Sequence, residues 1–476
     1  MWTEPHGTEH ITLIDPRDGK PSAVVRCADA VDVDAAVSTA RRLFDDGPQW
    51  PLPDRLRALS RLAEIIERRV EDFADIISEE MGAPPAFARQ GQVGTAVSTL
   101  RGIVEAASTF RFTETVADSV VIAEPAGPVA AITPWNFPLH QALGKVGAAL
   151  ACGCPVVLKP SELTPLSSYL LAEVALEAGV PAGWLSVLAG RGEVTGRALV
   201  EHPDIEVVSF TGSTEVGRSI AATAGARLAR VALELGGKSP SVLLDDLDDD
   251  AFATAVTTSL RFCLMNAGQT CAAWTRMIVP ATRYADAAAL LRELAATYVP
   301  GENLGPLVSA THWERVTGFL REGVDAGAEV IHGEPAPPRP PHGYYLNPVV
   351  FGRVTPSMRI VREEIFGPVL VVQTHSGDDD AVRLANDTCY GLGGAVFGAD
   401  QARAVAVARR IRSGSVHING LNGNRSAPFG GFKQSGIGRE FGRWGLEEFL
   451  EVKSIQPPPG FAYPISHSLL LEENHE

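Results

Sequence analysis

The stretch Val129-Ala-Ala-Ile-Thr133 decides the fold, because it begins a series of short apolar runs that alternate with helical stretches. Apolar runs of this length, bounded by polar or glycine-rich segments, are typical of buried parallel strands. The runs cover residues 129–133, 155–159, 185–188, 207–210 and 231–235, and the helical stretches cover residues 140–152, 167–179, 193–201 and 214–225. This alternation predicts βαβ units, and therefore an α/β fold with a parallel sheet covered by helices on both faces.

Polar or glycine-rich segments follow the predicted strands, where such sheets bind their ligands. These segments are Pro134-Trp-Asn136, Lys159-Pro-Ser-Glu162, Thr211-Gly-Ser213 and Gly236-Gly237. Lys159 and Glu162 are spaced to hold the two hydroxyls of a ribose. The stretch 211–217 leads into a helix whose N-terminus can bind phosphate. By contrast, the glycine pattern at 190–196 has the wrong spacing for a dinucleotide fingerprint, and we expect a loop there.

The remaining elements follow from periodicity and from helix-breaking residues. We expect an amphipathic helix over 54–81 that ends at Gly82, a helix over 92–110, a strand over 119–124 and a helix over 249–264. The acidic cluster 245–250 resembles a metal site, but carboxylates also stabilise a helix N-terminus, and we favour a solvated cap. The proline-rich segment 333–343 predicts a surface loop.

Composition excludes several classes of protein. The chain has 476 residues, which suggests two or three domains, and its 57 acidic and 41 basic residues give a net charge of −16. This charge argues against nucleic acid or an anionic membrane as a partner. Neither a secretory signal nor a long apolar run occurs, so we expect a cytoplasmic protein without a membrane segment. The six cysteines lack the spacing of a disulfide scaffold or a metal site, and we expect Cys152 and Cys154 to be packed in the interior.

Three separate residues could form a catalytic group. Cys271 stands among small and polar residues in Gly268-Gln-Thr-Cys271-Ala-Ala, which suits a nucleophile, although on local sequence alone an inert buried cysteine is more common. Glu234 ends an apolar strand, where partial desolvation raises the pKa of a carboxyl group toward a value useful for a general base. The amide of Asn136 could stabilise an oxyanion. Taken singly, the glutamate could serve in a salt bridge and the asparagine in a turn.

Seven motifs in order make the sequence resemble the NAD(P)-dependent aldehyde dehydrogenase superfamily over roughly residues 10–455. The motifs are Pro134-Trp-Asn-Phe-Pro138, Lys159-Pro-Ser-Glu162, Phe210-Thr-Gly-Ser213, Glu234-Leu-Gly-Gly-Lys238, Gly268-Gln-Thr-Cys271, Glu363-Glu-Ile-Phe-Gly-Pro368 and Pro428-Phe-Gly-Gly-Phe-Lys433. One departure is the 37-residue interval from Glu234 to Cys271, a few residues longer than in well-known animal members. We place the extra residues in the acidic loop at 245–250.

The resemblance implies a role for each matching residue. Cys271 is the expected nucleophile, Glu234 the base that activates water, and Asn136 with the backbone N–H of Cys271 the oxyanion hole. Lys145 and Glu440 match positions associated with proton relay. The expected cofactor contacts are Thr133, Pro134, Trp135, Lys159, Ser161, Glu162, Phe210, Gly212, Ser213, Leu235, Glu364 and Phe366, with Glu364 and Phe366 beside the nicotinamide.

These roles imply oxidation of an aldehyde to a carboxylic acid through a thiohemiacetal and a thioester. NAD is the expected cofactor, since a charged Glu162 would repel the extra phosphate of NADP, although NADP stays possible. Two alternatives are open. Coenzyme A instead of water could resolve the thioester, which the carboxylate at 234 argues against, or the chain could be a catalytically silent relative, which the joint presence of Cys271, Glu234 and Asn136 argues against.

The resemblance also implies a substrate pocket, a domain division and an assembly. Pocket walls are expected at Gly144, Thr270, Ala272 and Trp274, with the small Gly144 leaving a roomier tunnel. We expect an NAD-binding, Rossmann-like domain at 1–108 and 125–236, a catalytic domain at 237–427, and oligomerisation segments and a tail at 109–124 and 428–476. A homodimer or homotetramer would form through strands near 109–124 and 449–456, because exposed strand edges tend to pair.

Overall fold

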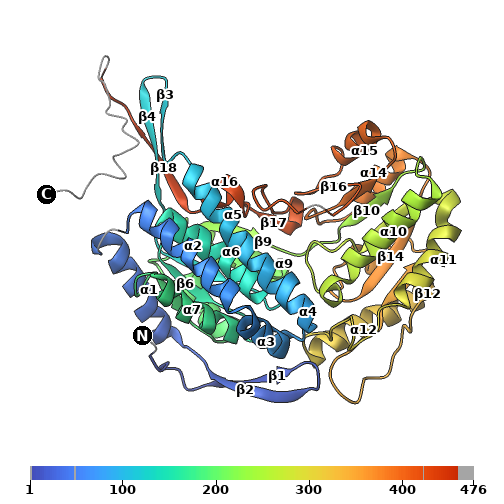
Figure 1. Ribbon diagram of the computed structural model, residues 1–476, viewed down its shortest axis with the longest axis horizontal. Helices are drawn as coiled ribbons and strands as arrows, with labels where there is room; N and C mark the ends of the chain where they lie inside the picture. The colour runs from blue at the N-terminus through green and yellow to red at the C-terminus, as the bar shows by residue number, and fades with distance from the viewer. Residues whose placement is uncertain (1–2, 48–49, 422, 459–476) are drawn as a thin grey trace.

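The computed structural model describes residues 3–47, 50–421 and 423–458. Two large sheets lie side by side, one in the blue and green half of Figure 1 and the other in the yellow and red half. The first sheet has the order β17-β9-β8-β5-β6-β7, in which every neighbouring pair except the antiparallel β17–β9 is parallel. Its strands are β5 (Val129–Ile132), β6 (Val156–Lys159), β7 (Leu185–Val187), β8 (Val207–Thr211), β9 (Arg230–Glu234) and β17 (Gly436–Ile437). The five predicted parallel strands are confirmed.

Alternate side chains of this sheet enter two different cores, because successive strand residues point to opposite faces. Val129 and Ala131 of β5 pack in the core that holds α2 (Leu52–Arg68), α3 (Val70–Met81), α5 (Thr95–Thr109), α6 (Pro138–Cys152) and α7 (Leu166–Ala178). Ala130 and Ile132 pack on the other face with α1 (Ala30–Asp46), α8 (Arg197–Glu201) and α9 (Thr214–Gly225). The predicted coverage of both faces is therefore present.

The second sheet follows β9 in the chain and has the order β12-β13-β14-β11-β10-β15-β16. Its strands are β10 (Pro240–Leu243), β11 (Arg276–Pro280), β12 (Glu329–His332), β13 (Val349–Gly352), β14 (Val369–His375), β15 (Ala395–Phe397) and β16 (His417–Ile418). The covering helices are α10 (Asp249–Leu264), α11 (Tyr284–Ala295), α12 (Ala310–Asp325), α13 (Arg359–Arg362), α14 (Asp378–Asn386) and α15 (Gln401–Ala408). Cys271 lies in the turn between α10 and β11, on the side of the sheet that faces the first half.

A third, three-stranded sheet projects from the molecule at the top of Figure 1. It consists of β18 (Leu450–Ile455), β4 (Ser119–Pro125) and β3 (Thr113–Val116), all antiparallel. The predicted strand at 119–124 is thus confirmed and joins the two chain segments that we expected to take part in assembly. An antiparallel hairpin of β1 (His10–Asp15) and β2 (Lys20–Arg26) lies at the opposite end. The last residues of the predicted tail, 459–476, lie outside the described residues.

Two predictions of helix limits were wrong. The periodic stretch 54–81 forms two helices, because the backbone at Arg69 leaves helical geometry (φ −101°, ψ 28°) while its guanidinium bonds Asp72 of α3 and Glu173 of α7. Gly82 does end the second helix, with φ +80°. The stretch expected to be helical over 92–110 begins earlier, with α4 (Pro85–Phe87) and a π-helical turn, η1 (Ala88–Gly94), before α5. The spacing of the apolar residues continues through Arg69, so the sequence pattern does not reveal the break between the two helices.

The glycine pattern at 190–196 is not a loop but includes a second π-helical turn, η2 (Gly192–Gly196), which continues into α8. Gly196 lies against the aliphatic part of Lys159, with 3.5 Å between the Lys159 Cδ and the position of a Cβ at 196. The π-helical turn therefore packs beside the end of β6. The proline-rich segment 333–343 contains neither helix nor strand, as predicted.

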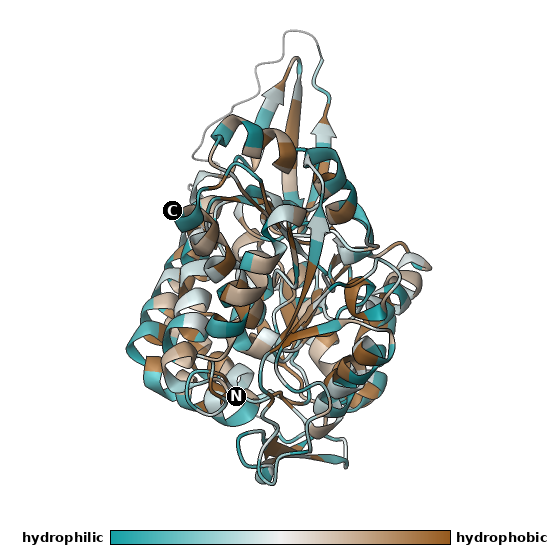
Figure 2. Ribbon diagram, turned by 90° about the vertical axis from the view of Figure 1, so that its right-hand side faces the viewer, coloured by the Kyte–Doolittle hydropathy of each residue, from teal (hydrophilic) through white to brown (hydrophobic). Residues whose placement is uncertain are grey.

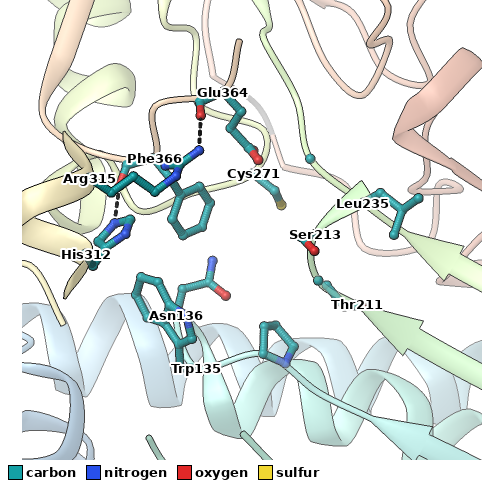
Figure 3. A pocket seen from close by; sticks show the side chains of 13 residues that line it. Trp135, Asn136, Thr211, Ser213, Leu235, Cys271, His312, Arg315, Glu364 and Phe366 are labelled. Carbon is teal, nitrogen blue, oxygen red and sulfur yellow. Dashed lines mark hydrogen bonds between the residues drawn. The ribbon is translucent and has the colours of Figure 1, made fainter. Parts of the chain in front are cut away.

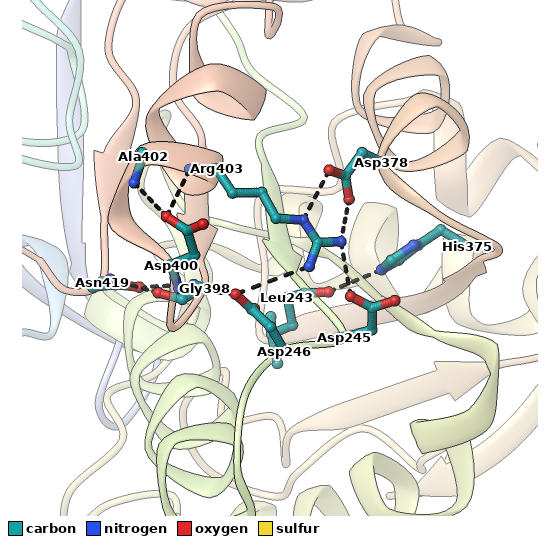
Figure 4. Close-up of polar contacts among 10 residues, drawn as sticks. All are labelled: Leu243, Asp245, Asp246, His375, Asp378, Gly398, Asp400, Ala402, Arg403 and Asn419. Carbon is teal, nitrogen blue, oxygen red and sulfur yellow. Dashed lines mark hydrogen bonds and ion pairs between the residues drawn. The ribbon is translucent and has the colours of Figure 1, made fainter.

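The acidic cluster 245–250 caps a helix and forms ion pairs with an arginine. Asp248 caps α10 and accepts from the Ala251 N–H at 2.8 Å. Asp245 and Asp246 face Arg403 of α15, which also bonds Asp378 of α14 (Figure 4). The carboxylates thus tie three elements together through one guanidinium. Cys152 and Cys154 are buried and donate to the carbonyl oxygens of Leu446 and Phe449, as expected for interior cysteines.

Among the helices of the described residues, none has the length and hydrophobicity needed to span a bilayer.

Candidate active site

A cavity of about 250 Å³ lies between the two large sheets and is the site toward which the polar strand ends converge (Figure 3). The residues that follow β5, β8 and β9 form one side of the cavity. The turn that bears Cys271 and the segment 364–366 form the other side. Its lining consists of Pro134, Trp135, Asn136, Thr211, Gly212, Ser213, Leu235, Gly236, Cys271, His312, Arg315, Glu364 and Phe366. Two of the three predicted catalytic residues, Cys271 and Asn136, therefore share one cavity.

The turn that presents Cys271 has an unusual backbone. Asn266 and Ala267, within the 3₁₀ turn η3 (Met265–Gly268), both have φ +56°, and Gly268 has φ +73°. Consecutive left-handed residues are costly unless the surroundings hold them. The Gln269 side chain does so, because it donates to the carbonyl oxygens of Asn266 and Pro306 and accepts from the Val308 N–H at 2.9 Å. This anchor fixes the cysteine at the cavity wall.

Asn136 is anchored to the same turn. Its Nδ2 donates to the Gln269 carbonyl oxygen at 3.0 Å, and its own carbonyl oxygen accepts from the side chains of Gln92 and Asn266. A side-chain amide has two N–H groups, so one remains for an acceptor in the cavity. No acceptor for the Cys271 backbone N–H occurs among the described residues. The second N–H of the Asn136 side chain and the Cys271 backbone N–H are thus two hydrogen-bond donors available beside the cysteine.

The electrostatic environment opposes ionisation of the Cys271 thiol. Burial, then the charges of Glu364 and Glu234, raise the pKa of Cys271 to about 12, and the Ala272 N–H lowers it only partly. The thiol lines the cavity, but it carries its proton at neutral pH. A proton acceptor nearby is consequently required for nucleophilic attack.

This environment predicts the pH dependence of alkylation in cofactor-free protein. Below its pKa, the ionised fraction of a thiol rises about tenfold per pH unit. The rate at which iodoacetamide alkylates Cys271 should therefore still rise about tenfold per pH unit between about pH 7 and pH 9. The measurement is best made in a Cys389→Ser background, because Cys389 is the exposed cysteine of the described residues. A plateau near pH 8 would show an ordinary or activated thiol instead.

Glu234 is buried behind the cavity and does not line it. Burial, then the neighbouring charge of Glu440, raises the pKa of Glu234 well above its usual value. Neither oxygen of the Glu234 carboxylate has a hydrogen-bond partner among the described residues. Glu440 in turn bonds Lys145 of α6 at 2.5 Å, and both side chains are buried. The predicted base and the predicted relay pair are therefore neighbours in the interior.

Residues expected to contact a cofactor occupy the edge of the first sheet. Lys159 ends β6, is buried, and pairs at 3.6 Å with Glu162, whose side chain is 38% exposed. Ser213 caps α9 and accepts from the Val216 N–H. Ser161 is buried and accepts from the Leu163 N–H. Phe210 lies in the core, and its ring occupies the space that a side chain at Gly212 would need.

This edge fits a dinucleotide. The oxygens Thr133 Oγ1 and Thr211 Oγ1, at the ends of β5 and β8, are buried and have no partner among the described residues. A helix N-terminus with an exposed serine cap suits a pyrophosphate, and a carboxylate beside a lysine suits ribose hydroxyls. Across the cavity, Glu364 accepts from the Gly237 N–H at 2.9 Å, and burial raises the pKa of Glu364 to about 7.

His312 and Arg315 line the cavity but were missed in the sequence. His312 Nε2 donates to the Phe366 carbonyl oxygen at 2.7 Å, and burial lowers the pKa of His312 to about 4, so the ring is neutral. Arg315 donates to the carbonyl oxygens of Glu364 and Ile365. Both stand on the first turns of α12, after the cap Ser309, and no local motif distinguishes this turn from that of any other helix.

One expected pocket wall was wrong. Trp274 is fully buried and packs edge-on against Phe262 and Phe397 in the core of the second sheet. The segment that leads into β11 therefore directs this side chain away from the cavity. Thr270 and Ala272 flank Cys271 as the sequence requires. Gly144 faces the ring of Phe441, with 3.5 Å from the ring to the position of a Cβ at 144. The space left by the glycine is thus bordered by an aromatic side chain from another segment.

The described residues contain no cluster of three or more His, Cys, Asp or Glu side chains that could hold a metal ion.

Known proteins resemble this chain over nearly its whole length. The model of the aldehyde dehydrogenase family matches residues 2–455. The chain is 40% identical to a 3-succinoylsemialdehyde-pyridine dehydrogenase of Pseudomonas sp., over 96% of each chain.

Solved structures give the same result. The chain resembles a mutant of aldehyde dehydrogenase C from Pseudomonas syringae in complex with NAD+ and octanal, with TM-score 0.93, 42% identity, and 96% and 95% of the two chains covered. It also resembles a Mycobacterium tuberculosis aldehyde dehydrogenase in complex with NAD+, with TM-score 0.93, 37% identity, and 97% and 98% coverage. These likenesses confirm the predicted fold class, and NAD+ in both relatives is the cofactor expected from the sequence. The chain belongs to the aldehyde dehydrogenase family.

Proposed function

We propose that this aldehyde dehydrogenase oxidises an aldehyde to the carboxylic acid with NAD, using Cys271 as nucleophile, Asn136 and the Cys271 N–H as oxyanion donors, and Glu234 as base. The observation that carries the proposal is the shared cavity, in which the Cys271 thiol and the Asn136 amide meet the strand ends that suit a dinucleotide. NAD, when bound, supplies the acceptor for the two electrons and the hydrogen that leave the aldehyde carbon.

Different residues would bind different parts of NAD. Lys159 and Glu162 would hold the adenine-side ribose, while Gly212 and Ser213 would face the pyrophosphate. Thr133, Pro134, Trp135, Leu235, Glu364 and Phe366 would surround the nicotinamide half. His312 and Arg315 support this assignment, because their bonds to the carbonyl oxygens of residues 364–366 fix that segment against the cavity.

The first chemical step is addition of the Cys271 sulfur to the aldehyde carbonyl. The carbonyl oxygen becomes an oxyanion, which accepts from Asn136 Nδ2 and from the Cys271 N–H. Because the pKa of the thiol is raised, its proton has to pass to a nearby base as the C–S bond forms. Oxidation of the resulting thiohemiacetal leaves a thioester on Cys271.

Hydrolysis of the thioester requires an activated water. Glu234 is suited to this step, because its carboxylate has no internal hydrogen-bond partner among the described residues, and its raised pKa makes the ionised form a stronger base than an ordinary glutamate. Glu440 and Lys145, which border Glu234 in the interior, are then suited to carry that proton away. The acid leaves, and the Cys271 thiol is restored.

The proposed function is tested by NADH formation across short aliphatic, long aliphatic, aromatic and charged aldehydes, with Cys271→Ala as the blank. NADH formation in the wild type alone would support the proposal. A rate that depends on added coenzyme A would indicate the acylating alternative. Alkylation of Cys271 without NADH from any aldehyde would indicate a silent relative.

Glu162 predicts a preference for NAD over NADP. A 2′-phosphate would stand beside a carboxylate of the same charge, so kcat/KM with NAD should exceed that with NADP by about tenfold or more, and Glu162→Gln should reduce the ratio. Glu177→Gln, an exposed carboxylate on α7, is the control. A higher kcat/KM with NADP in the wild type would contradict the assignment.

We also propose that residues 1–108 and 125–236 form the NAD-binding domain and 237–427 the catalytic domain, and that copies associate through strands near 109–124 and 449–456. The exposed edge of β3 and the outward Val116 and Val452, 53% and 70% exposed, support association there. A single-chain mass by light scattering at micromolar concentration would contradict it.

A further inference from the structure

A buried serine that takes no part in the proposed chemistry supports the wall of the cavity. Ser435 is fully buried and ends the 3₁₀ turn η5 (Lys433–Ser435), which leads into β17. Its Oγ donates to the Gly236 carbonyl oxygen at 2.7 Å and accepts from the Gly391 N–H at 2.9 Å. Its own carbonyl oxygen accepts from the Leu235 N–H at 2.9 Å. Leu235 and Gly236 both line the cavity, so Ser435 contacts its wall directly.

The hydroxyl of Ser435 fixes one particular peptide group. The carbonyl oxygen of Gly236 and the N–H of Gly237 belong to the same planar peptide and point in opposite directions. The oxygen accepts from Ser435 Oγ, and the N–H donates to Glu364 Oε1 at 2.9 Å. Rotation of this peptide would break both bonds at once. The Ser435 hydroxyl therefore sets the direction of the N–H that holds the Glu364 carboxylate.

Two glycines bring this peptide into close contact with its neighbours. Glu364 Oε2 occupies the space that a side chain at Gly236 would need. The carbonyl oxygen of Cys271 occupies the corresponding space at Gly237. The peptide thus touches both the carboxylate and the turn that bears the proposed nucleophile. A rotation of the peptide would displace the Glu364 carboxylate, which also lines the cavity.

The segment that carries Ser435 is held by both halves of the molecule. Gln434 Oε1 accepts from the Arg218 guanidinium of α9 at 2.6 Å. The Gln434 N–H donates to the Cys389 carbonyl oxygen of the second half at 3.0 Å. The residue after Ser435 pairs with Glu234 in the ladder of β17 with β9. Because these contacts come from several elements, the Ser435 hydroxyl is a fixed support for the peptide.

We propose that Ser435 is a positioning residue for NAD, which directs the Glu364 carboxylate toward the hydroxyls of the nicotinamide ribose by fixing the 236–237 peptide. This inference rests on the proposed function and adds a residue to its cofactor site. A ribose hydroxyl donates a charge-assisted hydrogen bond to a carboxylate, and this bond is lost when the carboxylate turns away. The adenosine and the pyrophosphate would lie at the other end of the site, so Ser435 should affect the nicotinamide half alone.

The binding test compares NAD with ADP, which has the adenosine and the pyrophosphate but lacks the nicotinamide ribose. Ser435→Ala should raise the Kd for NAD by about 3- to 10-fold, as expected for one lost hydrogen bond, and change the Kd for ADP by less than about twofold. Titration calorimetry of the full chain measures both constants. Ser259→Ala, which removes an equally buried hydroxyl from α10, is the matched control and should change neither. Equal losses for NAD and ADP, or no loss for NAD, would overturn the proposal.

A double-mutant cycle distinguishes positioning from general support of the fold. If Ser435 acts through Glu364, Ser435→Ala should have little further effect on NAD binding in Glu364→Gln protein. Additive losses would overturn the proposal. Ser435→Cys keeps a weaker hydrogen-bonding group of similar size, so it should lose less NAD affinity than Ser435→Ala. It also takes the place of Ser435→Ala in the cycle if thermal unfolding shows that the alanine variant does not fold.

Binding and turnover together separate this inference from the proposed function. In turnover, Ser435→Ala should raise the KM for NAD and change kcat less, since a ribose contact exists both before and during oxidation. If no aldehyde yields NADH, the proposed function fails, whereas a selective loss of NAD affinity in Ser435→Ala still supports the inference. If NADH forms and Ser435→Ala binds NAD as the wild type does, the inference alone fails.

Discussion

Cys271→Ala is expected to lose NADH formation with every aldehyde, a fall of about 10⁴-fold or more in kcat. Its sulfur is the one thiol in the cavity lining, and the proposed steps form and break their covalent bond at that atom. The substitution removes one heavy atom at a half-buried position, so the fold should persist. The measurement is steady-state NADH formation, accompanied by thermal unfolding of the variant.

Cys389→Ser is the matched control, because Cys389 is exposed and lies outside the cavity lining. Its kcat should equal that of the wild type. Cys271→Ser should also be nearly inactive, since a serine hydroxyl is a poorer nucleophile and a poorer leaving group than a thiol. Residual turnover within tenfold of the wild type in Cys271→Ala would contradict the proposed covalent route.

Glu234→Gln should have the second largest effect, a loss of about 10²- to 10⁴-fold in steady-state kcat. A glutamine has the same shape but cannot accept a proton from water, so the thioester should accumulate. We therefore expect a rapid burst of about one NADH per site, followed by slow turnover. Stopped-flow absorbance measures the burst, and mass spectrometry of the quenched protein detects the acyl group on Cys271.

Glu80→Gln is the control for loss of a buried carboxylate. Burial raises the pKa of Glu80 to about 7, and its oxygens accept from the Leu166 and Ser167 N–H groups at the start of α7. This substitution should change Tm without changing the ratio of burst to steady-state rate. If Glu234→Gln abolishes the burst as well, Glu234 acts before or during thioester formation rather than in its hydrolysis.

The substitutions also report on the electrostatics of the thiol. The charge of Glu234 is among the causes of the raised pKa of Cys271, so Glu234→Gln should lower that pKa and increase alkylation of Cys271 near neutral pH. Faster alkylation together with slower turnover would separate the reactivity of the nucleophile from the role of the base.

The strand and helix order was predictable because each parallel strand is buried on both faces. The five apolar runs from 129 to 235 gave the first sheet and, through the residues that follow them, the edge that holds Lys159, Thr211 and Glu234. The break at Arg69 was not predictable, because a single apolar period continues through it, and the π-helical turn at 192–196 was not predictable, because its three glycines within seven residues are typical of a loop.

The sequence by itself determined the family and named the groups that we propose to react, since a thiol, a carboxylate and an amide in the expected motifs need no coordinates to be recognised. The tertiary structure decided how those groups are placed. Only the packed fold sets the raised pKa of Cys271, buries Glu234 beside Glu440, turns Trp274 into the core, and brings His312 and Arg315 to the site. The physical reason is that desolvation and close contact depend on residues distant in the chain, whereas strand patterning and side-chain chemistry are properties of short stretches.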